Sequence, residues 1–154
     1  MLKTLLFLNT LFLFCIAGIA NAQSVSNYSG SKTVIFDSNV DTPLNSMEKE
    51  MLTDIYGETL QKNVLDNPQR LKSIKNILRN RVEILNLPNY PKDYKLLSQV
   101  PLFDKYNTSL KREKFKKAKF NPLKYNFDFY AKQAQVFRVD NTDYYIIIKS
   151  QHQN

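Results

Sequence analysis

Residues 135–148 read QVFRVDNTDYYIII and decide the fold class of this chain. Two runs rich in β-branched and aromatic residues, at 135–139 and 144–148, flank four turn-forming residues at 140–143. The pattern predicts a C-terminal β-hairpin. Because an isolated hairpin is only marginally stable in water, its apolar face needs helices or a third strand, and residues 33–36 (TVIF) are the candidate strand.

Two helices are predicted before the hairpin. Asn45 and Glu48 have the spacing of a capping box, and apolar residues then recur at helical spacing to about residue 65, with Gly57 as a weak point. Asn67 followed by Pro68 predicts a second helix start, since proline at the first helical position lacks only an N–H that needs no partner. The second helix should reach about residue 86, because its apolar stripe comprises Leu71, Ile74, Leu78, Val82 and Leu85.

The expected fold class is α+β. The short link between the helices favours an antiparallel helical hairpin, packed with a small antiparallel sheet that contains the C-terminal hairpin. Residues 87–101 contain three prolines and predict a connecting loop, with one turn of helix before Pro101. At 154 residues in all, the chain suits a single small domain, placed at residues 33–154.

The N-terminus predicts export. A charged start at Lys3, an apolar run at 11–19 and the small-residue motif at 20–22 have the order of a signal peptide, so residues 1–22 are expected to be cleaved. A membrane anchor is the alternative, but Asn9 and Thr10 interrupt the apolar run. Cleavage removes Cys15, the one cysteine, and leaves no transmembrane span. Residues 23–32 are polar and predict a flexible leader, and the expected destination is periplasmic or extracellular.

The sequence contains few of the residues that form common catalytic and metal sites. The one histidine, His152, stands in a polar C-terminal tail, and the one cysteine leaves with the signal peptide. Histidine-based triads, cysteine nucleophiles and zinc sites are therefore not expected. The three glycines form no phosphate-binding loop. We predict no catalytic residue, no metal site and no cofactor.

Carboxylates provide one enzymatic alternative. Glu50, Asp54 and Glu58 recur on one face of the first predicted helix, and paired carboxylates hydrolyse glycosidic bonds in many enzymes. A carboxylate-dependent hydrolase acting on an envelope polymer is therefore the alternative function. Such a row is more often a solvated face, and we expect it to form ion pairs with a basic row on the second helix. That basic row comprises Lys72, Lys75 and Arg79.

Residues 102–132 carry most of the positive charge. The full chain has a formal net charge of +8, and this segment holds nine basic and three acidic residues, with eight aromatic residues interleaved. Lysines that attract a polyanion, beside rings that stack on bases or sugars, use this composition. A simpler interpretation puts the rings in the core and the lysine stems over apolar surface. The candidate binding residues are Lys111, Arg112, Lys114, Lys116, Lys117, Lys119 and Lys124.

The partner expected from this composition is an anionic envelope polymer or another exported protein. Lysine outnumbers arginine eight to one in the segment, whereas specific phosphate recognition relies on the arginine fork, so the attraction should be weak and non-specific. No specific nucleic-acid motif is present. The expected function is a non-enzymatic exported binding module, and a structural partner of another exported protein is a third hypothesis.

The C-terminal third also carries a resemblance. Residues 101–107 (PLFDKYN), 120–125 (FNPLKY) and 138–144 (RVDNTDY) resemble small exported proteins of flavobacterial type that have no assigned function. The resemblance implies a Gram-negative envelope or the medium as the destination. It implies no catalytic or binding residues.

Overall fold

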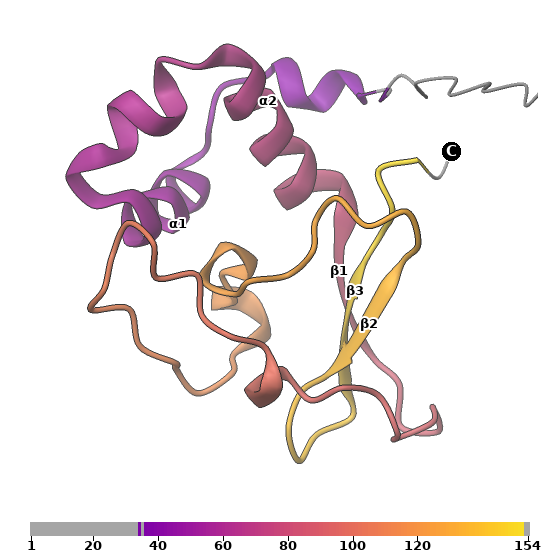
Figure 1. Ribbon diagram of the computed structural model, residues 1–154. Coiled ribbons are helices and arrows are strands. Elements are labelled where there is room, and N and C mark those ends of the chain that lie inside the picture. The colour runs from indigo at the N-terminus through magenta and orange to yellow at the C-terminus, as the bar shows by residue number, and fades with distance from the viewer. Residues whose placement is uncertain (1–33, 35, 153–154) are drawn as a thin grey trace, which may run out of the picture. The chain divides into compact units, whose positions relative to one another are not determined.

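The computed structural model describes residue 34 and residues 36–152. The predicted signal peptide and leader lie outside these residues. The main elements are α1 (Ser46–Tyr56), α2 (Pro68–Asn76), β1 (Val82–Asn86), β2 (Gln135–Arg138) and β3 (Tyr144–Ile148), joined by loops and short helical turns (Figure 1). The predicted α+β fold class is confirmed. Within the described residues, none of the helices has the length and apolar character needed to cross a membrane.

The C-terminal hairpin forms as predicted, with β2 and β3 paired in antiparallel register. A third strand completes the sheet, but it is β1 and not residues 33–36. Val34 and Phe36, the described members of that range, lie outside the sheet. The strand order is β1-β3-β2, so Ile146 at the centre of β3 faces Ile84 on one side and Phe137 on the other.

The position of β1 corrects the predicted extent of the second helix. We expected the helix to reach Asn86, but α2 ends at Asn76, a π-helical turn follows to Arg81, and β1 begins at Val82. Val82 fits the helical stripe and also a two-residue alternation with Ile84, so the short apolar run is ambiguous. Pairing with β3 favours the strand over the helix, because it gives all five residues of β1 a cross-strand partner.

Both predicted helix starts are confirmed. Asn45 Oδ1 accepts the Glu48 N–H at 2.8 Å, and Glu48 Oε2 accepts the Asn45 N–H at 2.9 Å, which completes a capping box. Asn67 Oδ1 accepts the Arg70 N–H at 3.0 Å, and Pro68 is the first helical residue. These contacts form within one turn of chain, which is why sequence spacing identifies them.

Gly57 ends α1 instead of weakening a longer helix. Its backbone angles, φ 48° and ψ −130°, lie in a region that residues with a Cβ atom rarely adopt. A 3₁₀ turn at Gly57–Thr59 and a π-helical turn at Gln61–Leu65 lead from there to α2. The segment predicted as one helix to residue 65 is therefore three consecutive helical pieces.

Buried apolar side chains form two clusters that meet at Val82 and Phe129, which pack against both. The sheet cluster has as its buried members Leu97, Val100, Phe120, Tyr125, Phe127, Phe137, Val139, Ile146 and Ile148. The helical cluster has Leu52, Ile55, Tyr56, Val64, Ile74, Ile77 and Leu123. Both helices contribute to the second cluster, as the predicted apolar stripes require. Residues 87–101 form the expected connecting loop, with one 3₁₀ turn at Leu97–Gln99.

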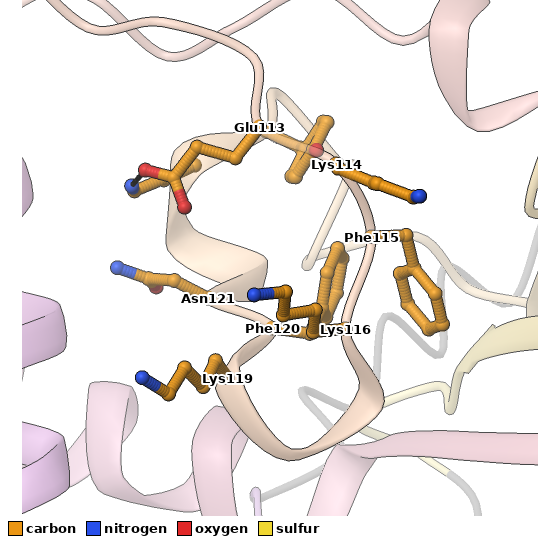
Figure 2. A pocket seen from close by; sticks show the side chains of 9 residues that line it. Glu113, Lys114, Phe115, Lys116, Lys119, Phe120 and Asn121 are labelled. Atoms are coloured by element: carbon orange, nitrogen blue, oxygen red, sulfur yellow. Dashed lines mark hydrogen bonds and ion pairs between the residues drawn. The ribbon is translucent and has the colours of Figure 1, made fainter.

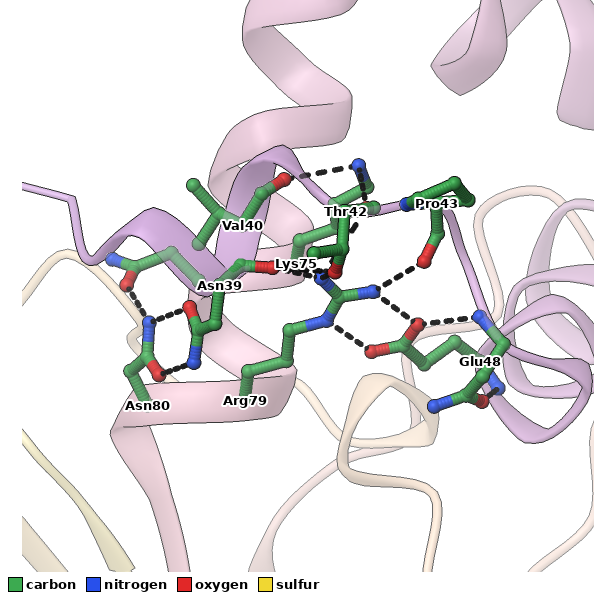
Figure 3. Close-up of polar contacts among 10 residues, drawn as sticks. Asn39, Val40, Thr42, Pro43, Glu48, Lys75, Arg79 and Asn80 are labelled. Carbon is green, nitrogen blue, oxygen red and sulfur yellow. Dashed lines mark hydrogen bonds and ion pairs between the residues drawn. The ribbon is translucent and has the colours of Figure 1, made fainter.

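A polar network holds residues 39–43 against the end of α2 (Figure 3). The Arg79 guanidinium donates to both carboxylate oxygens of Glu48, each at 2.6 Å. It also donates to the carbonyl oxygen of Asn39, to that of Pro43 at 2.9 Å, and to the hydroxyl of Thr42 at 2.7 Å. Arg79 thus joins the capping box of α1 to the segment that precedes it.

The same network corrects the predicted ion pairs between the helices. Lys75 is buried, and its ammonium donates to the carbonyl oxygens of Val40 and Thr42 at 3.0 and 2.7 Å. Lys72 pairs with Asp41 at 3.1 Å. The basic row therefore binds the segment before α1 and, through Arg79, Glu48 in the first turn of α1. It does not pair with the predicted carboxylates Glu50, Asp54 and Glu58.

Candidate functional site

Part of the basic segment surrounds a cavity of about 370 Å³, which we call the lysine pocket (Figure 2). The pocket brings together four of the seven predicted binding residues. Its lining comprises Glu113, Lys114, Phe115, Lys116, Lys119, Phe120, Asn121, Lys124 and Tyr125. With four lysines and one glutamate, the lining carries a net positive charge.

Two short turns shape the pocket. A 3₁₀ turn at Lys117–Lys119 is followed by a second at Pro122–Lys124. Asn121 fixes the second turn, since its Oδ1 accepts the Leu123 N–H at 3.1 Å and its Nδ2 donates to the Met51 carbonyl at 2.9 Å. This wall of the pocket is therefore tied to α1, and the Asn121 amide is already engaged.

The positive charge of Lys124 is balanced by two carboxylates. Its Nζ lies 2.5 Å from Glu113 Oε1 and 3.2 Å from Asp54 Oδ2, and its side chain is 13% exposed. Burial alone would lower the pKa of Lys124, but the hydrogen bonds with Glu113 and Asp54 outweigh burial and raise it. The same contact with Lys124 lowers the pKa of Glu113. Lys124 thus stays charged and serves the packing of the pocket wall.

Three cations of the pocket have no carboxylate partner among the described residues. Lys114, Lys116 and Lys119 are all exposed and take part in none of the ion pairs found there. In Figure 2 the ammonium groups of Lys116 and Lys119 lie on the same side as the Asn121 amide, whereas Lys114 extends to the opposite side. Flexible ammonium groups attract anions as point charges and do not impose a fixed geometry on them.

The other predicted binding residues have different surroundings. Arg112 donates to the carbonyl oxygens of Leu97 and Val100 at 2.8 and 2.6 Å, so its guanidinium fastens the connecting loop. Lys111 and Lys117 are exposed and do not line the lysine pocket. The predicted set thus divides into residues that line the pocket, one residue that supports the fold, and two lysines on the surface nearby.

Most aromatic residues near the pocket belong to the core. Phe120, Tyr125 and Phe127 are buried, with ring centroids 5.4 and 5.5 Å apart in sequence order. Phe115 is half-buried, 5.5 Å from Phe120, and is the least enclosed ring of the pocket lining. Rings stacked on one another in the core are not free to stack on bases or sugars, so the simpler interpretation holds for these residues.

Glu113 is the pocket residue that sequence reasoning missed, and the pairing of Asp54 with Lys124 was not predicted. Glu113 counted only toward the charge balance, and Asp54 belonged to the carboxylate row of α1. Their common partner Lys124 lies far along the chain from Asp54, so no local spacing signals the contact. Glu50 and Glu58, the other carboxylates of the predicted row, are exposed and do not line the pocket.

The functional proposal rests on the geometry of the site. Within the described part of the chain, no three His, Cys, Asp or Glu residues are grouped so that they would hold a metal ion. The chain matches no protein-family model, no curated protein and no solved structure.

Proposed function

We propose that this protein is a non-enzymatic exported binding module whose lysine pocket attracts an anionic partner, with an envelope polymer as the first candidate. The observation that carries the proposal is the grouping of Lys114, Lys116 and Lys119 around one cavity without carboxylate partners among the described residues. Cations grouped at a surface raise the local concentration of a polyanion and speed its association. The predicted signal peptide and the resemblance to exported proteins favour the envelope or the medium as the compartment.

The geometry supports binding better than hydrolysis. A hydrolase needs two carboxylates that flank a bound substrate, and Asp54 already pairs with Lys124 at 3.2 Å while Glu50 is exposed on α1. Asn121 has both ends of its amide engaged with backbone groups. The groups of the pocket that remain available are lysine ammonium groups, which suit attraction of an anion.

The test compares two triple variants with the same change in net charge. The pocket variant is Lys114→Gln, Lys116→Gln and Lys119→Gln. The control variant is Lys49→Gln, Lys62→Gln and Lys95→Gln, at lysines that are exposed and form no ion pair among the described residues. Retention on immobilised heparin, a model anionic polysaccharide, is measured at low salt and near physiological salt, with neutral dextran as the blank.

We expect the pocket variant to lose affinity for heparin and the control variant to keep most of it. Three lost contacts at about 0.5 kcal/mol each amount to roughly a tenfold loss at low salt. The wild-type affinity should fall as salt rises, since charges more than about 8 Å apart are screened near physiological salt. Equal losses in the two triple variants would show that net charge alone drives retention, and the pocket proposal would fail.

Capture from envelope extract then addresses the partner itself. A partner released by salt and lost in the pocket variant supports an anionic polymer. A protein partner that resists salt and binds the pocket variant equally well would favour an apolar interface instead, and would contradict the electrostatic proposal.

A further inference from the structure

A second cavity of about 520 Å³, which we call the aromatic pocket, shares Tyr125 with the lysine pocket but is lined by none of its lysines. Pockets of this size that are mostly apolar, with a few polar groups, are the usual form of small-molecule sites. Its lining comprises Tyr56, Arg70, Ile74, Ile77, Phe103, Leu123, Tyr125, Asn126, Phe127, Asp128, Phe129 and Tyr130. Arg70 is the one cation and Asp128 the one carboxylate of this lining.

Arg70 is held in place by aromatic rings. Its guanidinium carbon lies 5.5 Å from the ring centroid of Tyr56 and 5.9 Å from that of Tyr106. Its Nη2 is 3.5 and 3.4 Å from the two hydroxyl oxygens, which is longer than an ordinary hydrogen bond. Among the described residues, Arg70 forms no ion pair, and its Nε and Nη1 donate to no protein acceptor. Most of the guanidinium fork is therefore available to a ligand.

Hydrogen bonds hold the loop that carries Asp128, Phe129 and Tyr130. Arg81 donates to the carbonyl oxygen of Phe129 and, at 2.9 Å, to that of Lys149. Asp128 Oδ1 accepts the Tyr130 N–H at 3.0 Å, so this carboxylate is engaged with its own loop. The cavity is thus formed before any ligand arrives, which lowers the entropic cost of binding.

We propose that the aromatic pocket binds a small aromatic carboxylate, whose carboxylate group pairs with the Arg70 guanidinium while its ring lies among the aromatic side chains. A planar guanidinium matches a carboxylate with two parallel hydrogen bonds, and a half-buried pair of this kind is stronger than an exposed one. The apolar lining, which includes Phe103 and Phe129, favours an aromatic ring in the remaining volume. Asp128 disfavours ligands with more than one negative charge. This inference does not rest on the proposed function, because its ligand and its cation both differ.

The test uses the purified protein and a matched pair of ligands, 1-naphthylacetate and the neutral 1-naphthylacetamide. Binding is followed by NMR, with the Arg70 Nε–H signal as the local probe. We expect the acid to bind roughly tenfold more tightly than the amide, the factor for one charge-assisted contact worth about 1.4 kcal/mol. The Arg70→Gln variant should bind the two ligands equally. Lys49→Gln, which removes one positive charge at an exposed position of α1 away from the pocket lining, should keep the preference for the acid.

Folding and binding are separated by measuring the thermal midpoint of each variant. If Arg70→Gln does not fold, Arg70→Lys retains the charge without the fork and should show a reduced preference for the acid. Three results would overturn the proposal: equal binding of acid and amide by the wild type, a preference as large in the Arg70 variants as in the wild type, or no binding of the acid at millimolar concentration.

Discussion

Replacing Glu48 with glutamine would leave Arg79 beside α1 without its carboxylate. Glu48 is 6% exposed, and each of its carboxylate oxygens lies 2.6 Å from a nitrogen of Arg79. Glutamine has the same shape, and its remaining oxygen can still accept the Asn45 N–H of the capping box. The loss measured with Glu48→Gln therefore reports the ion pair and not the helix cap.

The expected loss follows from the burial of the pair. Removing one partner of a buried ion pair costs about 3–5 kcal/mol, because the remaining charge is left uncompensated. Arg79 keeps acceptors at Pro43 and Thr42, and its side chain is 14% exposed. These contacts place the expected loss at the lower end, about 3 kcal/mol in the free energy of unfolding.

The loss should depend on pH. The hydrogen bond with Arg79 holds the pKa of Glu48 below its ordinary value of 4.5, although burial opposes this shift. Because the folded-state pKa is the lower one, the carboxylate contributes stability that is fully present above about pH 4.5 and is lost as pH falls through the folded-state value. The wild type and Glu48→Gln should therefore differ most near neutral pH and converge in acid.

Urea unfolding of both proteins at several pH values measures the difference. Glu50→Gln, on the same helix but exposed, is the control and should change the free energy of unfolding by less than about 0.5 kcal/mol. A loss in Glu48→Gln no larger than that of the control, or a difference that stays constant from neutral to acidic pH, would refute the reasoning.

Three further substitutions test other parts of the structure. Gly57→Ala should destabilise the protein by about 1–2 kcal/mol, since φ is 48° there while no neighbouring atom blocks a Cβ; an unchanged urea midpoint would contradict this. Leu52→Ala should lower the free energy of unfolding by about 3 kcal/mol, because Leu52 is fully buried in the helical cluster. Such substitutions usually cost about 2–5 kcal/mol, so a loss under about 1 kcal/mol would mean that the site is not close-packed. Arg112→Gln should lower the thermal midpoint through its lost bonds to Leu97 and Val100, yet bind heparin as well as Lys49→Gln does. If Arg112→Gln binds heparin more weakly than Lys49→Gln does, Arg112 contributes to binding after all.

The sequence by itself determined the features that depend on neighbouring residues. Asn45 with Glu48, and Asn67 with Pro68, identify both helix starts because a cap is completed within one turn of chain. The hairpin at residues 135–148 is equally local, since two strand-forming runs flank a turn-forming sequence. The concentration of positive charge in residues 102–132 also follows from composition alone.

The tertiary structure decided the features that depend on residues far apart in the chain. Residues 82–86 fit a helix or a strand, and only pairing with β3 makes them β1. The sequence does not show which carboxylates pair with Arg79 and Lys124. In the folded chain Arg79 pairs with Glu48, and Lys124 pairs with Glu113 and Asp54. Which lysines share a pocket depends on these same contacts. Capping and turn formation are settled within a few residues, whereas ion pairs and strand partners depend on which distant segments are packed together.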